Sequence, residues 1–252
     1  MPQRDTQEKG MRDKKTGLEL IESNVETYGY HVYLVSSKTE PRYAYTIGLN
    51  DKLGIELIFA GGIFYLKEDL YRIFDSIIRE LKRDQNIEGL SVTDRRLGTF
   101  TLSKVHDTWS QEMLLGAYDY YQTEDIAAYQ IKPDMEHTTL DIPDMSVDRK
   151  QSINAVWKWL DHDWDLPVPK NSTATTNLDA LMGKPITEVM RWEVDEWEMF
   201  AGSGPDILKE DMRVVPVGTI LGIDASLSKA LSLEVGKGIW RESATTEWNN
   251  WN

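Results

Sequence analysis

Four histidines are the residues of this sequence best suited to acid–base chemistry near neutral pH. They are His31, His106, His137 and His162, and no two of them stand at a metal-ligand spacing. In a small-molecule or nucleotide-modifying enzyme, His31 or His106 would be the general base, and Tyr45 would be a third catalytic residue. The alternative is that these histidines have only structural roles.

The segment Asp161-His162-Asp163-Trp164-Asp165 is the most metal-like cluster, because alternating aspartates begin calcium-binding loops. Such a loop needs glycine at its sixth position and glutamate at its twelfth, where this chain has Leu166 and Ser172. We therefore interpret the cluster as a solvated acidic helix end. The chain lacks cysteine, which excludes thiolate metal sites and disulfides. The sequence predicts no metal and no cofactor.

Aromatic and acidic side chains indicate a binding surface as the alternative to catalysis. Tryptophan buries a large area at little entropic cost and is enriched in protein interfaces, and nine tryptophans are many for 252 residues. Core packing is the competing explanation for them. The predicted binding residues are Tyr30 and Tyr43 in the N-terminal half, and Glu196, Trp197, Glu198 and Trp240 in the C-terminal half.

Three predicted strands, at 31–36, 43–49 and 55–60, and a predicted helix at 66–83 would build the N-terminal half. The third strand is a nearly continuous apolar run, which is typical of burial on both faces. The apolar residues of the helix recur at helical spacing and are assigned to the core. This framework would hold a polar–aromatic cleft made of Tyr30, His31, Tyr43, Tyr45 and His106.

The predicted fold is α+β, with two small domains that each contain a mostly antiparallel or mixed sheet with flanking helices. A polar arm spans 1–18, the first domain 19–164, a linker 165–177 and the second domain 178–252. The linker is assigned from two prolines and a run of Ser, Thr and Asn. In the second domain, 214–223 is predicted as a strand with Pro216 at an edge or bulge.

Acidic residues outnumber basic ones by 42 to 28, which gives a net charge of −14. The excess is divided equally, with −7 in residues 25–150 and −7 in residues 151–252. Nucleic acid is bound through lysine and arginine surfaces, so this balance disfavours a nucleic-acid partner. A basic protein would be attracted, although the acidity can also serve solubility alone.

No stretch of the sequence has the roughly 18 apolar residues of a membrane span. The N-terminal residues are polar and lack the apolar core of a signal peptide. We therefore expect no membrane partner and a cytoplasmic location. The oligomeric state is left open.

Several motifs of the N-terminal half resemble a bacterial family known as domain of unknown function 4262. They are GYHV at 29–32, PRYAYTIGL at 41–49 and IELIFAGG at 55–62, followed by the helix at 66–83. Later matches extend the resemblance over about residues 20–145. Because the family has no established activity, the resemblance implies a folded unit without specifying a reaction.

The C-terminal part is similar to immunity protein family 33 of the polymorphic-toxin systems. The segments that carry this similarity are DEWEMF at 195–200, RVVPVGTILGID at 213–224 and VGKGIWRES at 235–243. The resemblance implies a protein that neutralises a bacterial toxin by binding it. The leading hypothesis is thus a non-enzymatic bacterial immunity factor whose partner is a protein, with a basic toxin as the candidate.

Overall fold

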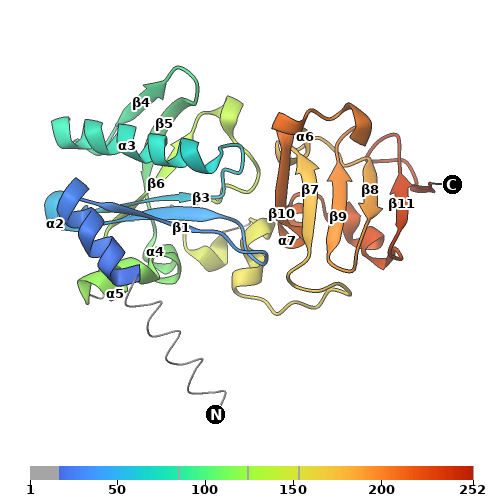
Figure 1. The fold of residues 1–252 in the computed structure, drawn as a ribbon, viewed down its shortest axis with the longest axis horizontal. Coiled ribbons are helices and arrows are strands. Elements are labelled where there is room, and N and C mark those ends of the chain that lie inside the picture. Colours follow the sequence, from blue (N-terminus) through green and yellow to red (C-terminus); the bar gives the residue numbers. More distant parts are fainter. Residues whose placement is uncertain (1–16, 85, 124, 153, 252) are drawn as a thin grey trace, which may run out of the picture.

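The computed structural model describes residues 17–84, 86–123, 125–152 and 154–251, which fold into two units lying side by side (Figure 1). Each unit is built on a mixed sheet of six strands with flanking helices. The predicted α+β class is therefore confirmed. Most of the predicted N-terminal arm lies outside the described residues, and residues 17–28 form a helix.

The first sheet has the strand order β1-β2-β3-β6-β5-β4. Its neighbouring strands are antiparallel except for β3 and β6, which run parallel. A parallel pair needs a long crossover connection, and here that connection contains a long helix, the β4–β5 hairpin and two shorter helices. The strands are β1 (His31–Val35), β2 (Tyr43–Ile47), β3 (Glu56–Ala60), β4 (Ser91–Asp94), β5 (Gly98–Lys104) and β6 (Ala128–Pro133).

Helices cover both faces of the first sheet (Figure 1). On one face, α3 (Lys67–Asp84) buries the apolar stripe that predicts a helix at 66–83, so that prediction is confirmed. On the other face, α4 (Asp107–Met113) and α5 (Leu115–Tyr121) pack through buried Trp109 and Ala117. The shorter helices are α2 (Asn50–Leu53), η1 (Met135–His137), η2 (Arg149–Gln151) and η3 (Ala155–Leu160), of which the last three are 3-10 helices.

The second sheet has the strand order β10-β7-β9-β8-β11-β12, and only β7 and β9 are parallel. Its helices are α6 (Leu178–Leu181) and α7 (Val217–Ile223), with the 3-10 helices η4 (Gly204–Asp206), η5 (Lys209–Asp211) and η6 (Ala225–Ser232). The strands are β7 (Thr173–Asn177), β8 (Glu188–Arg191), β9 (Glu196–Phe200), β10 (Met212–Pro216), β11 (Lys237–Trp240) and β12 (Asn249–Asn250).

The strand predicted at 214–223 is wrong over its last seven residues. β10 ends at Pro216, and the next seven residues form α7, which buries Val217, Ile220 and Leu221 in the core of the second unit. Valine, threonine and isoleucine favour strands in the sequence. Burial of one side of this segment against the sheet outweighs that preference, because propensities are weaker than tertiary packing. The edge position of Pro216 is confirmed, since β10 is the first strand of the sheet.

Residues 165–177 are packed into the second unit. Val168 is buried in the core, and Thr173–Asn177 form β7, which pairs with both β9 and β10. The polar composition of this segment predicts a linker, but threonine is β-branched and fits a pleated strand well. The chain therefore enters the second sheet about five residues before the predicted linker ends.

Two arginines bind the loop that follows β3, and one of them, Arg213, links the two units. Arg42, which precedes β2, donates from one guanidinium nitrogen to the carbonyls of Gly62 (2.9 Å) and Tyr65 (2.8 Å). Arg213 of β10 donates to the carbonyls of Ile63 (2.8 Å) and Phe64 (2.7 Å). Four consecutive carbonyls are thus satisfied by one arginine from each unit. We call this arrangement the arginine clamp.

The second contact between the units is the packing of α7 on η3, where glycine is required. A Cβ atom on Gly222 would lie 2.5 Å from the backbone of Val156, and one on Gly218 would lie 2.7 Å from the Trp159 ring. A backbone bond from Leu140 to the Leu181 carbonyl (2.8 Å) adds a third link.

The described helices include none long and apolar enough to cross a membrane.

The α7–η3 contact predicts the effect of Gly222→Ala on stability. Alanine is normally better than glycine inside a helix by about 1 kcal/mol, but here the added methyl collides with backbone atoms that cannot rotate away. We expect a net loss of about 1–3 kcal/mol in the free energy of unfolding, measured by urea titration. Gly17→Ala, where nothing lies within 4 Å of the new Cβ, should be neutral or stabilising. Equal stability of both variants would contradict the packing described.

Candidate functional site

Aromatic side chains form a continuous row on the face of the first sheet that α4 and α5 cover. Tyr33 and Tyr45 are register partners with ring centroids 5.4 Å apart, and Tyr43 stacks on Tyr45 at 6.2 Å. The row continues to Trp157 of η3 (6.4 Å from Tyr43) and from there to Trp109 of α4 (6.1 Å). We call these five residues the aromatic row. It links two strands with a helix and a 3-10 helix.

His31 extends the aromatic row, while Tyr30 does not. The His31 ring lies 6.1 Å from that of Tyr33, and its Nδ1 lies 2.9 Å from the Asn24 amide nitrogen. Burial lowers the pKa of His31. Tyr30 points to the opposite face, where its hydroxyl donates to Asp75 of α3. Adjacent residues of an extended chain face opposite sides of a sheet, so the two cannot share a cleft.

His106 acts as the N-cap of α4, with its Nδ1 accepting from the backbone N–H of Thr108 at 3.3 Å. Tyr45 is almost fully buried, and its hydroxyl accepts from the N–H of Gly116 (3.0 Å). Within the described residues, no hydrogen bond or ring contact joins His106 to His31. Of the predicted cleft, the structure brings together only His31, Tyr43 and Tyr45. No histidine–acid pair is aligned there for catalysis.

A buried carboxylate anchors the loop after β2. Glu56 of β3 is fully buried and accepts from the backbone N–H groups of Gly48 (3.1 Å) and Asn50 (3.0 Å), and from the hydroxyls of Thr46 and Tyr121 (both 2.5 Å). Burial raises the pKa of Glu56 to about 7, against the opposing effect of these hydrogen bonds. With four donors on two oxygens, the carboxylate is a structural anchor.

The face of the second sheet opposite α7 carries a groove of about 290 Å³, which we call the outer groove. Two half-exposed indoles, Trp192 and Trp251, are 51% and 43% exposed there. Residues from β8, β9, β10 and the C-terminal segment line it: Glu188, Val189, Met190, Trp192, Glu198, Phe200, Gly204, Pro205, Met212 and Trp251.

The predicted acidic–aromatic patch is divided between the two faces of this sheet. Glu198 lines the outer groove, and Glu196, two residues earlier in β9, is exposed. Trp197 alternates with them and lies in the core, only 2% exposed, so its prediction as a contact residue is wrong. Trp240 is partly buried and pairs in register with Glu188.

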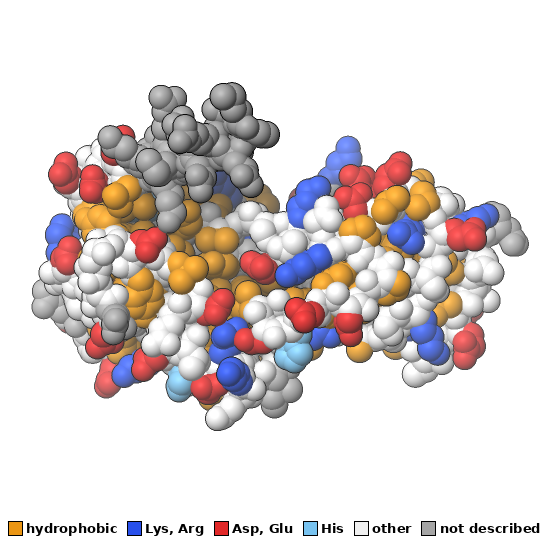
Figure 2. All heavy atoms as spheres, turned by 90° about the horizontal axis from the view of Figure 1, so that it is seen from below, with side chains coloured by type: hydrophobic (Ala, Val, Ile, Leu, Met, Phe, Trp, Pro, Cys, Tyr) orange, Lys and Arg blue, Asp and Glu red, His pale blue; other side chains and the backbone are white. Residues whose placement is uncertain are grey.

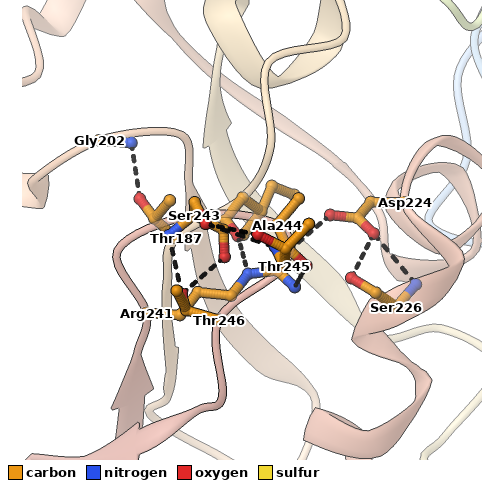
Figure 3. A network of polar contacts seen from close by, with 10 residues as sticks. Thr187, Gly202, Asp224, Ser226, Arg241, Ser243, Ala244, Thr245 and Thr246 are labelled. Atoms are coloured by element: carbon orange, nitrogen blue, oxygen red, sulfur yellow. Dashed lines mark hydrogen bonds and ion pairs between the residues drawn. The ribbon is translucent and has the colours of Figure 1, made fainter.

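A buried arginine fixes the C-terminal segment that bears Trp251. Arg241 is 4% exposed and donates to the Ile186 carbonyl (2.8 Å). It also donates to the Ala244 carbonyl (3.3 Å) and to Asp224 (3.0 Å), which Figure 3 labels. Its guanidinium also lies 4.3 Å from the centre of the Trp248 ring. The network ties the turn after β11 to the loop before η6.

Trp251 reaches the outer groove over a glycine. Its backbone N–H donates to the carbonyl of Gly238 in β11 at 3.1 Å, and a Cβ on Gly238 would lie 2.5 Å from the Trp251 ring. Any larger residue at 238 would therefore push the indole away from the sheet. The wall of the groove depends on this close approach.

Among the described residues, no group of three or more His, Asp or Glu side chains could hold a metal ion. The acidic cluster at 161–165 accordingly shows no arrangement of ligands.

The first unit matches a known family along most of its length. Residues 24–138 match the family described as Domain of unknown function (DUF4262). Residues 24–138 form a DUF4262 domain. The match spans all six strands of the first sheet and ends before η2 and η3. No curated protein and no solved structure matches the chain. Nothing identifies the second unit, so its resemblance to immunity protein family 33 stays a prediction.

The structure adds residues that the sequence analysis does not select. Glu56 has a recognisable signal, a single acid inside the apolar run 55–60. Trp251 also has one, because it lies in a polar C-terminal segment, where an exposed tryptophan is expected. Trp192 has none, because an exposed tryptophan cannot be told from a core tryptophan without the fold. Trp157 lies outside the DUF4262 domain yet completes the aromatic row of that domain.

The raised pKa of Glu56 predicts a pH dependence of stability. Between the unfolded value of 4.5 and the folded value of about 7, the folded state retains a proton that the unfolded state releases. The free energy of unfolding should therefore fall as pH rises through this window, by about 3 kcal/mol from this group, and stay level above it. Glu56→Gln should remove that part of the slope in urea titrations at pH 5, 6, 7 and 8.

The exposed Glu88 provides the matched control, because Glu88→Gln removes a carboxyl from the same unit without touching the anchor. Its profile should follow that of the unchanged protein. Parallel profiles for all three proteins would show that Glu56 does not titrate as described.

The Arg241 network predicts a large loss of stability for Arg241→Met. The change leaves Asp224, whose side chain is 19% exposed, without its cation and frees two carbonyls. Breaking a buried ion pair costs about 3–5 kcal/mol, measurable by urea unfolding. Arg95→Met, at an exposed position, should change stability by less than about 0.5 kcal/mol. If the two arginine variants were equally stable, the anchoring role of Arg241 would be refuted.

Proposed function

We propose that this protein is a non-enzymatic bacterial binding protein that acts in the cytoplasm and docks a basic partner protein in the outer groove. The observation that supports this most is the pair of half-exposed indoles, Trp192 and Trp251, that line a groove together with Glu198. Large aromatic side chains in a shallow groove are the usual anchors of protein interfaces. Here they are held by strands and by the Arg241 network.

The charge of this surface suits a cationic partner. Glu196 and Glu198 have no hydrogen bond or ion pair with other side chains in the part of the chain that the structure describes. Residues 151–252 as a whole carry 16 acids and 9 bases. Charges of this kind at the rim of a groove accelerate encounter with a basic protein and exclude acidic ones. Solubility alone would not require indoles beside them.

The finer proposal is that the partner is a toxin and this protein its immunity factor. It rests on the resemblance of residues 195–200, 213–224 and 235–243 to immunity protein family 33. Bound in the outer groove, a basic toxin would have its cationic surface covered. The enzyme alternative gains no support, because His106 caps a helix and His31 lies apart from it.

The proposal is tested by expressing each reading frame adjacent to this gene, with and without this protein. One of them should arrest growth, and this protein should restore it. Trp192→Ala combined with Trp251→Ala should weaken binding of that product at least 30-fold in calorimetry, because losing one anchoring indole costs about 2 kcal/mol or more and such losses are not additive. Glu196→Lys combined with Glu198→Lys should weaken binding, and the affinity of this variant should depend less on the salt concentration.

A charge-matched control separates local from global electrostatics. Glu88→Lys combined with Glu136→Lys changes the net charge equally at exposed positions of the first unit, and it should keep rescue intact. The proposal fails if no neighbouring product is toxic, or if the groove variants and this control rescue equally well.

A further inference from the structure

The outer groove lies around Met190 of β8. In register, Met190 is flanked by Gly238 of β11 and by Glu198 of β9. The Trp251 ring covers Gly238, since a Cβ there would lie 2.5 Å from the ring and 2.9 Å from the Met190 sulfur. Trp192 follows Met190 by two residues and lines the same groove, as the alternation of side chains along a strand requires. The register thus brings two half-exposed indoles and one carboxylate together around a thioether.

Glu198 is a partly buried acid without a counter-ion. It is less exposed than Glu196 on the same strand, and no hydrogen bond or ion pair engages its carboxylate in the described part of the chain. The other acid of the groove, Glu188, accepts from the N–H of Gly204 at 2.8 Å. A carboxylate that is partly withdrawn from water gains from a cation that can donate hydrogen bonds to it. Glu198 is therefore the acid most available to a bound cation.

The arginines of the neighbouring strands are engaged elsewhere. Arg191 of β8 donates to the Leu233 carbonyl (2.7 Å) and lies 4.8 Å from the ring of Trp197, which belongs to the core face of the sheet. Arg213 of β10 belongs to the arginine clamp. The described lining of the outer groove includes no lysine or arginine, whereas the face drawn in Figure 2 carries basic side chains among acidic ones over both units. A cation for Glu198 must therefore come from another molecule.

The chemistry of the groove favours a guanidinium over an ammonium group. A guanidinium is flat and weakly hydrated, so it stacks on indole rings, and two of its N–H groups can bond one carboxylate. The ammonium of lysine is a compact charge that keeps its water more strongly. Carbon and sulfur of Met190, Phe200 and Met212 in the same lining suit the methylene stem of a long side chain. Arginine combines such a stem with the planar cation.

The size of the groove suits one side chain. Its volume of about 290 Å³ is at the lower limit of pockets that hold whole organic ligands, which is about 300 Å³. Trp192 and Trp251 are 51% and 43% exposed, so their rings are accessible to a side chain that enters from outside. Arginine is also one of the residues that contribute most to the affinity of protein interfaces.

We propose that the outer groove holds a single arginine side chain of the partner protein, with its guanidinium against the indoles of Trp192 and Trp251 and paired with Glu198. This inference rests on the proposed docking function and specifies which group of the partner the groove recognises. It makes the affinity depend on one residue of the partner, beyond the general attraction between an acidic and a basic surface.

NMR titration of the full-length protein tests the groove with three capped peptides, Gly-Gly-X-Gly-Gly, in which X is arginine, lysine or citrulline. The arginine peptide should shift the indole N–H signals of Trp192 and Trp251, assigned from their Phe variants, with a Kd of about 1 mM. Citrulline has nearly the same shape without the charge and should bind at least tenfold more weakly, and lysine at least threefold. The inference is overturned if the arginine peptide shifts neither signal at about 10 mM, a tenfold excess over that Kd, or if another peptide binds equally well.

Two glutamate variants locate the binding. Glu198→Gln keeps the size of the side chain and removes its charge, and it should weaken the arginine peptide at least fivefold. Glu234→Gln removes a charge from an exposed position of the same unit outside the groove, and it should change the affinity less than twofold. Equal losses in the two variants would show that the acidic molecule attracts the peptide without a site, and would refute the inference.

The arginine inference and the docking function fail separately. Each arginine of a neutralised neighbouring product is changed to glutamine in turn, and one of these changes should weaken binding at least tenfold. If none does, the docking function stands and the arginine inference is refuted. If no neighbouring product arrests growth while the arginine peptide binds as described, the toxin partner is refuted and the preference of the groove for arginine stands.

Discussion

The arrangement of the two units depends on the arginine clamp at residues 62–65. A loop that turns between a buried strand and a long helix exposes several carbonyls in a place where water has limited access, and buried carbonyls must find donors. Arg42 and Arg213 supply them, one from each unit. A guanidinium is suited to this because its donors are planar, fixed and always charged. The clamp therefore fixes the conformation of the loop and, through Arg213, links the two units.

At two other places, a single buried ionisable group holds a surface segment in position through several hydrogen bonds. Glu56 gathers the loop after β2, and Arg241 gathers the C-terminal turn. Glu56 bonds to backbone N–H groups six and eight residues earlier in the chain, and Arg241 bonds to a carbonyl 55 residues earlier. The outer groove thus depends on an anchor, Arg241, that does not itself line the groove. A rigid surface of this kind loses little entropy on binding.

Prediction from the sequence succeeded where a pattern is local. The stripe of α3 and the first strands follow from periodicity, since one buried face imposes its spacing on the chain. It failed at α7, where β-branched residues pack as a helix, and in residues 173–177, where threonines form a central strand. In both places a contact with a distant element outweighs the local preference. The residues of the predicted cleft are separated for a related reason, since Tyr30, just before β1, and His31, its first residue, point to opposite faces of the sheet.

By itself, the sequence determined the fold class, the main helix, the acidic balance of both halves and the DUF4262 resemblance, because composition and periodicity are properties of the chain. Tertiary structure alone decided that Trp192 is exposed and that Trp109 and Trp157 meet in the aromatic row. It also decided that Glu198 faces a groove while Trp197 faces the core. Such choices depend on which residues distant in sequence come together, and pairwise contacts of that kind leave no periodic trace in a single chain.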